Sequence, residues 1–178
     1  MGDKISVLIP EEKVEERIRE LGKQIGEDYK KEGVEEILLI GILKGGAFFA
    51  TELAKRLDLQ VMVDFMAASS YGDSTESNGN VKITRDTDLS VEGRDILIVE
   101  DIIDTGRTLK ALLEIIGQRG AKSIRLCTLL DKPDRRVSQV KVDYNGFKIP
   151  DVFVVGYGLD YAQRYRNLPY IGVVEPEK

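Results

Sequence analysis

Three acidic side chains and a small, hydroxyl-rich turn follow directly on an apolar run in residues 96–109, which read ILIVEDIIDTGRTL. Glu100 and Asp101 adjoin the apolar residues, and Asp104 precedes a Thr-Gly-Arg-Thr sequence. Carboxylates beside a buried strand are costly unless they are paired or hydrogen-bonded. Their crowding here therefore indicates a binding or catalytic site rather than a requirement of folding.

The turn after these acids is suited to binding a phosphate. In an open parallel sheet, ligands bind beyond the carboxyl ends of the strands. Small residues at a helix start expose backbone N–H groups, and the helix dipole adds positive character. The turn consists of Thr105, Gly106, Arg107 and Thr108. Two acids beside such a turn fit a ligand with hydroxyls at one end and a phosphate at the other, which is the layout of a ribose 5-phosphate.

A purely structural interpretation of the same residues is also available. Glu100 and Asp101 would then cap a strand, and Asp104 or Thr105 would be the N-cap of the next helix. Asp-Thr-Gly before a helix is common, but the whole run from apolar strand to final threonine is much more specific. The whole run favours the ligand-binding interpretation.

A second glycine-containing turn stands at GILKGGAFF, residues 41–49. It is not a Walker A loop, because Lys44 precedes the paired glycines Gly45 and Gly46 instead of following them. The motif is either a simple strand-to-helix turn or a second phosphate site, where glycines let the backbone approach a pyrophosphate.

Composition limits the available chemistry. The chain has 178 residues, no histidine and a single cysteine, Cys127, which cannot form an internal disulfide. Without histidine, the commonest general base and all Ser-His or Cys-His nucleophile pairs are absent. Acid–base work must then fall to Asp, Glu, Lys or Tyr. A bound metal is expected to be a hard cation held by oxygens, such as Mg²⁺.

Charge and hydropathy argue against several other classes. The net charge of −5 disfavours non-specific binding to nucleic acid or to an anionic membrane. No apolar run is long enough for a transmembrane helix, and the N-terminus lacks the apolar core of a signal peptide. We therefore expect no nucleic-acid partner, no membrane association and a cytoplasmic location.

Strands and helices alternate through most of the chain. Apolar spacings of three and four predict a helix over 10–33, with Val14, Ile18, Leu21 and Ile25 on its buried face. The other predicted elements are strands at 35–43, 60–67, 81–86, 94–101 and 122–130, helices at 45–59 and 108–120, and a mobile loop at 69–80. The alternation predicts an α/β fold with a mainly parallel sheet flanked by helices.

The last forty or so residues differ from this pattern, with short strands, turns and a compact segment rich in Tyr and Arg. We expect one domain, residues 1–178, with a core of about 34–135 and a smaller lobe, the hood, formed mainly by 136–178.

Four further motifs occur in a characteristic order: LKGG at 43–46, SSYGDSTESNG at 69–79, LLDKPDRR at 129–136 and FVVGYGLDYAQRYRNLPYIG at 153–172. With the acidic strand end, this set resembles the bacterial hypoxanthine-guanine phosphoribosyltransferases of the purine phosphoribosyltransferase family. The resemblance covers about 34–174. It implies the type I phosphoribosyltransferase fold and Mg²⁺-dependent transfer of the phosphoribosyl group from phosphoribosyl diphosphate (PRPP) to N9 of hypoxanthine or guanine. A homodimer or homotetramer is also implied.

The resemblance assigns the sugar-phosphate and pyrophosphate contacts as follows. Glu100 and Asp101 would hold the ribose hydroxyls, and residues 105–108 would bind the 5-phosphate. Asp104 would be the acid/base at purine N7. The pyrophosphate would meet Leu43, Lys44, Gly45 and Arg166, and the family often has a cis peptide before this lysine. Ser70 and Tyr71 would belong to the loop that closes over the reacting centre.

The resemblance also implies the purine and metal contacts. Lys132 would donate to the purine 6-oxygen, while Phe153 would stack on the base. Ile102 and the Val154 backbone would line the purine. Asp160 would contact Mg²⁺ and the 2-amino group of guanine, and Glu100 and Asp101 complete the expected metal set.

Structural alternatives exist for individual residues. Tyr71 could be an exposed loop tyrosine, Phe153 a core residue, Lys132 a solvated strand-end lysine, and Asp160 and Arg166 a surface ion pair. One of the arginines at 135 and 136 could reach pyrophosphate.

At the level of function, the alternatives are a transferase of the same fold that uses xanthine, and an RNA-binding regulator on this fold, as among pyrimidine-operon attenuators. The regulator should carry a basic face, which the net charge disfavours.

Overall fold

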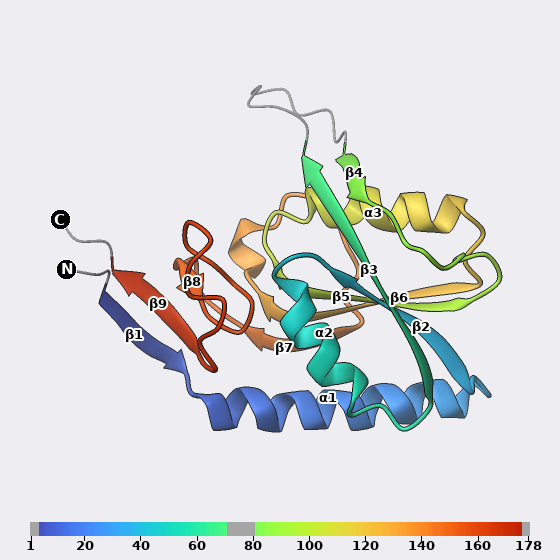
Figure 1. The fold of residues 1–178 in the computed structure, drawn as a ribbon, viewed down its shortest axis with the longest axis horizontal. Helices are drawn as coiled ribbons and strands as arrows, with labels where there is room; N and C mark the ends of the chain where they lie inside the picture. The colour runs from blue at the N-terminus through green and yellow to red at the C-terminus, as the bar shows by residue number, and fades with distance from the viewer. Residues whose placement is uncertain (1–3, 71–80, 176–178) are drawn as a thin grey trace.

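The computed structural model describes residues 4–70 and 81–175. The elements are β1 (Lys4–Ile9), α1 (Glu11–Lys31), β2 (Glu36–Ile42), α2 (Gly46–Ala54), β3 (Gln60–Ser70), β4 (Val81–Arg85), β5 (Asp95–Ile103), α3 (Arg107–Gln118), β6 (Ser123–Asp131), the 3₁₀ turn η1 (Pro133–Arg135), β7 (Tyr144–Lys148), β8 (Val154–Val155) and β9 (Ile171–Glu175). They form two sheets of unequal size (Figure 1).

The larger sheet has the strand order β4-β3-β2-β5-β6-β7. All neighbouring strands are parallel except β3 and β4, which pair antiparallel. Strand β5 lies between β2 and β6, so its carboxyl end meets the ends of both neighbours. The predicted α/β fold with a mainly parallel central sheet is confirmed.

Apolar residues fill both faces of this sheet, as continuous apolar strands require. Ile37 and Leu39 of β2 face the cluster that α1 and α2 cover, whereas Leu38 and Ile40 face the cluster beneath α3. Figure 1 shows α1 and α3 on opposite sides of the sheet, with α2 on the side of α1. The strands are thus held rigidly, and their carboxyl ends are left for a ligand.

The smaller sheet joins the two ends of the described chain. Its order is β1-β9-β8, with both pairs antiparallel, and the N- and C-terminal strands run side by side at one end of the molecule (Figure 1). The sequence analysis placed the hood mainly at 136–178 and assigned no element to the residues before the first helix. Strand β1 nevertheless belongs to this sheet, while β7 extends the large one.

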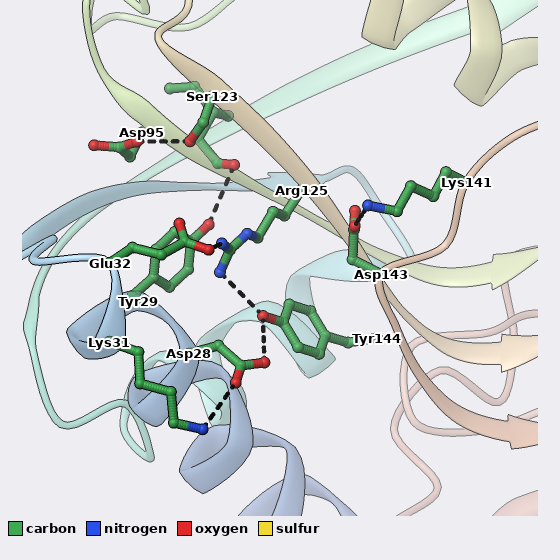
Figure 2. Close-up of polar contacts among 11 residues, drawn as sticks. Asp28, Tyr29, Lys31, Glu32, Asp95, Ser123, Arg125, Lys141, Asp143 and Tyr144 are labelled. Atoms are coloured by element: carbon green, nitrogen blue, oxygen red, sulfur yellow. Dashed lines mark hydrogen bonds and ion pairs between the residues drawn. The ribbon is translucent and has the colours of Figure 1, made fainter.

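Arg125 centres a polar network that ties α1 to β6 and β7 (Figure 2). Its guanidinium lies 4.3 Å from the centroid of the Tyr29 ring and donates to the Tyr144 hydroxyl at 3.2 Å. It also pairs with Glu32, and Tyr144 donates to Asp28 at 3.0 Å. Burial raises the pKa of Tyr144 to about 12.

Several boundaries differ from the sequence prediction. The predicted helix 45–59 ends at Ala54, and the strand predicted over 60–67 continues to Ser70. Strand β5 extends to Ile103 because its last residues pair with β6. The acidic pair therefore lies within the last part of the strand rather than at its end. Residues 71–80, most of the loop predicted as mobile, lie outside the described residues. Across the described part of the chain, no helix is both long and apolar enough to cross a membrane.

Candidate active site

The acidic pair is partly buried in the last part of β5. Glu100 Oε1 accepts a hydrogen bond from the Asp101 backbone at 3.0 Å, and Asp101 Oδ1 accepts one from the Ile102 backbone at 2.7 Å. Burial, with the charge of Asp101 beside it, raises the pKa of Glu100 well above its ordinary value. Burial also raises the pKa of Asp101. Adjacent buried carboxylates with raised pKa values are typical of a ligand-binding or catalytic site.

The LKGG turn packs directly against these carboxylates. The Leu43–Lys44 peptide bond is cis, as the family resemblance implied. A Cβ built on Gly45 would lie 1.7 Å from Asp101 Oδ2, and one built on Gly158 would lie 2.0 Å from the Gly45 carbonyl oxygen. At Gly158 the obstacle is backbone, so only glycine fits there, whereas a side chain at Gly45 would have to displace the Asp101 carboxylate. The proposed pyrophosphate turn, the acidic pair and the C-terminal motif therefore meet at one place.

The start of α3 has the glycine-containing turn that its sequence predicts. Gly106 has a φ of +81°, a left-handed conformation that glycine tolerates best, and stands immediately before the helix. A cavity of about 160 Å³ opens here, lined by Glu100, Ile102, Ile103, Asp104, Thr105, Gly106, Thr108 and Leu109. Glu100, Asp104, the turn and Ile102 thus line one cavity, which supports the predicted ribose-phosphate layout.

The segment after β6 lies over this turn. Asp104 pairs through Oδ1 with Arg135 Nε at 3.0 Å, and its carbonyl oxygen accepts from Arg136 Nε at 3.2 Å. Arg136 also pairs with Asp131. Lys132 is 9% exposed, and its ammonium lies 3.5 Å from Asp151 Oδ1. The structure thus gives both arginines carboxylate partners, and it buries Lys132 instead of leaving it solvated.

The C-terminal motif places Arg166 close to Lys44 of the LKGG turn. Arg166 donates to the Gly158 carbonyl at 2.7 Å and pairs with Asp160 at 3.0 Å. Gln163 accepts from both Lys44 and Arg166 at 3.2 Å, and its backbone donates to Asp160 at 2.8 Å. The sequence analysis missed Gln163, which connects the two predicted pyrophosphate cations. Its position inside the motif at 153–172 was the sequence feature that could have identified it.

Phe153 is 54% exposed and is therefore not a core residue. Its ring meets the Tyr161 ring edge-on, with centroids 5.5 Å apart and an interplanar angle of 82°. The next residue, Val154, is buried in β8. An exposed aromatic face held by a second ring is suited to stacking on a flat ligand.

Of the predicted loop pair, only one residue belongs to the described part of the chain. Ser70 is exposed at the end of β3, and Tyr71 lies outside the described residues. Within the residues that the structure describes, no three Asp, Glu or Cys side chains converge to hold a metal ion. Asp160 therefore does not form a closed metal cage with Glu100 and Asp101.

Comparison with known proteins identifies the class. The sequence pattern of the phosphoribosyl transferase domain matches residues 9–162. This is most of the chain, and it contains the acidic strand end, the LKGG turn and the start of the C-terminal motif. The chain belongs to the phosphoribosyl transferase domain family.

Within this family the chain is similar to hypoxanthine-guanine phosphoribosyltransferases. It is 55% identical over 170 residues to the Bacillus subtilis protein of that name, covering 96% of this chain and 93% of that one. A solved hypoxanthine phosphoribosyltransferase from Staphylococcus aureus superposes with a TM-score of 0.90 at 48% identity, covering 96% and 91% of the two chains.

A longer relative contains a similar segment. The chain is 54% identical over 171 residues, 96% of its length, to the bifunctional protein TilS/HprT of Listeria monocytogenes serotype 4b. It spans 26% of that protein.

Proposed function

We propose that the protein catalyses transfer of the 5-phosphoribosyl group from PRPP to N9 of hypoxanthine or guanine, giving IMP or GMP and pyrophosphate in purine salvage. The observation that carries this proposal is the meeting of Gly45, Gly158 and Asp101. It sets a pyrophosphate-binding turn against the acids that would hold the ribose hydroxyls. The names of the similar proteins support the same reaction.

In the proposed binding of PRPP, the start of α3 and the acidic pair hold different parts of the sugar phosphate. Backbone N–H groups and hydroxyls of residues 105–108 bind the 5-phosphate at the start of α3. The carboxylates of Glu100 and Asp101 accept hydrogen bonds from the ribose hydroxyls. Leu43, Lys44, Gly45 and Arg166 hold the pyrophosphate, and the Gln163 side-chain oxygen, which accepts from both cations, connects them.

The donor set fits a magnesium ion that the substrate helps to bind. Mg²⁺ is usually held by one or two carboxylates together with substrate phosphates and waters. Glu100, Asp101 and Asp160 offer carboxylate oxygens near the proposed pyrophosphate position. The ion would neutralise charge that develops on the leaving pyrophosphate.

The chain's own residues would perform the remaining chemistry. The anomeric carbon passes through an oxocarbenium-like state while the purine N9 attacks, and Arg166 stabilises the departing pyrophosphate. Asp104 takes the proton from N7 of the incoming base. Ser70 and Tyr71 belong to the loop that excludes water from the reacting centre.

Base selection rests on a single buried cation. Lys132 donates to the 6-oxygen of hypoxanthine or guanine and meets no acceptor at the 6-amino group of adenine. Sites built to hydrogen-bond one pattern reject another strongly. Phe153 stacks on the base, and Ile102, the Val154 backbone and Asp160 line its edge. Xanthine also has a 6-oxygen, so it is the second candidate acceptor.

We further propose a single domain with a core of about 34–135 and a hood mainly of 136–178, a cytoplasmic location, and assembly as a homodimer or homotetramer. An RNA-binding regulator on the same fold is disfavoured by the net charge of −5.

The test offers hypoxanthine, guanine, xanthine, adenine, uracil and orotate separately, each with PRPP and Mg²⁺, and measures nucleotide formation. We expect products from hypoxanthine and guanine and none from adenine or the pyrimidines. Bound PRPP without transfer to any of these bases would contradict the proposed reaction while leaving the ribose-phosphate site intact.

A further inference from the structure

Four charged side chains form a continuous line across the site. Asp104 Oδ1 lies 3.0 Å from Arg135 Nε, Arg135 Nη1 lies 3.7 Å from Asp151 Oδ2, and Asp151 Oδ1 lies 3.5 Å from the Lys132 ammonium. The two ends of this line are the proposed acid/base and the proposed reader of the 6-oxygen. Its two middle members, Arg135 and Asp151, have no role in the proposed reaction.

The backbone around these residues is fixed by other contacts. The Lys132 N–H donates to the Ile103 carbonyl at 3.0 Å, and the Arg135 N–H donates to the Lys132 carbonyl at 3.1 Å. On the other side, Ile149 N–H donates to the Asp131 carbonyl at 2.8 Å. The line of charges is therefore not needed to hold these segments together. The ion pairs instead determine the orientation of the four side chains.

We infer that Asp151 and Arg135 are positioning residues, through which one carboxylate after β7 orients both Lys132 and Asp104 for the purine. The inference rests on the proposed function. Among the described residues, Asp151 is the one carboxylate paired with Lys132, and it shares its second oxygen with Arg135. A side chain shared in this way restricts both cations.

The burial of Lys132 distinguishes this role from ordinary surface pairing, because the other three side chains are about half exposed. The Lys132 side chain is 11% exposed, whereas those of Asp104, Arg135 and Asp151 are 41–51% exposed. Partly exposed ion pairs add little to stability. Removing Asp151 should therefore leave the fold intact and change only how Lys132 is presented to the base. Misplacing a contact group can cost up to about 10²-fold in rate.

The Asp151→Asn variant keeps the size of the side chain but has no negative charge to pair with Lys132 and Arg135. We expect KM for hypoxanthine to rise ~10-fold, with KM for PRPP and the melting temperature unchanged. Asp151→Glu, which keeps the carboxylate, should recover much of the loss. Arg135→Gln breaks the connection to Asp104 and should lower kcat by ~5-fold or more. In the double variant the two effects should be less than multiplicative, because they act through one network.

The matched control is Asp134→Asn, an exposed acid in the same 3₁₀ turn as Arg135. It changes the net charge by the same amount and should leave every kinetic constant at the wild-type value.

The experiment measures initial rates of IMP formation over a grid of hypoxanthine and PRPP concentrations for each full-length variant. If the wild type forms nucleotide and Asp151→Asn matches Asp134→Asn, the positioning role is wrong and the proposed function stands. An equal rise in KM for both substrates, or a lowered melting temperature, would also overturn the positioning role in favour of a general structural effect. If the wild type forms no nucleotide from any base, the proposed function fails and the positioning role falls with it.

Discussion

Gly45 lies so close to Asp101 that a side chain at this position would require the Asp101 carboxylate or the turn to move. A Cβ at Gly45 would stand 1.7 Å from Asp101 Oδ2 and 2.7 Å from its carboxyl carbon. Two segments separated by more than fifty residues in sequence are thus in direct contact, and one of them carries the cis peptide before Lys44. This contact is the link between the turn and the acidic strand end on which the proposed reaction depends.

Gly45→Ala is therefore expected to displace either the turn or the carboxylate. We predict a loss of kcat/KM for PRPP of ~10²-fold and destabilisation by about 1–3 kcal/mol. Steady-state kinetics and urea unfolding measure the two effects. Gly117→Ala in α3 is the matched control, because its nearest new contact is an ordinary 3.8 Å to Ile124. Near-normal PRPP kinetics in Gly45→Ala would show that the contact is not needed for binding.

Asp104→Asn tests the proposed acid/base directly. The amide keeps the size of the side chain and can still accept a hydrogen bond from Arg135, but it cannot take up the N7 proton. We expect turnover to fall by ~10²-fold or more while the dissociation constants of PRPP and IMP change little. Rapid-quench kinetics and calorimetry separate the two quantities. Turnover close to that of the wild type would remove Asp104 from the mechanism.

The central sheet could be predicted from sequence because its signals are local. The apolar runs of β2, β5 and β6 and the spacing of Val14, Ile18, Leu21 and Ile25 each report burial within a short window, and all four of these α1 residues are buried. The glycine turn before α3 could also be predicted, because glycine most readily takes the left-handed conformation that Gly106 adopts there.

Long-range pairings could not be predicted in this way. Strand β1 gains its partner β9 from the opposite end of the chain, and no local pattern encodes that choice. The same limit applies to Gln163 and Asp151, whose contacts with Lys44 and Lys132 come from distant segments. Helix α2 ends sooner than its predicted length because helical propensity alone does not fix a boundary.

Cys127 provides a pH-dependent test of the core. It is fully buried in β6, and burial raises the pKa of its thiol. The unfolded thiol ionises near pH ~8.5 while the folded one stays protonated, so the folded state binds more protons. Its contribution to the unfolding free energy is therefore present below about pH 8.5 and is lost as pH rises further.

The measurement is urea unfolding of the wild type and Cys127→Ala between pH 7 and about 9.5, a range chosen below the ordinary ionisation of tyrosine. We expect the stability difference between the two to shrink with rising pH, by up to about 1.4 kcal/mol per unit. Disulfide exchange of the single thiol with an aromatic disulfide should occur only at the rate of unfolding. Rapid labelling of the folded protein would contradict the burial of Cys127.

Glu100→Gln should make the unliganded protein more stable and less able to bind PRPP. Burial and the neighbouring Asp101 raise the pKa of Glu100, so its ionised form is disfavoured in the folded state. Below the ordinary Glu pKa of 4.5 the wild type and the variant should have similar stability. As pH rises through the raised folded pKa, the wild type loses stability that the amide keeps. At neutral pH we expect a gain of roughly 0.5–2 kcal/mol, as is common when a functional charge is removed.

Urea unfolding without Mg²⁺ and PRPP, at pH 4 and pH 7, measures the gain, and Glu92→Gln on the surface is the control. A variant that is less stable than the wild type at pH 7 would show that the ionised carboxylate stabilises the fold, and the acidic pair would then be structural.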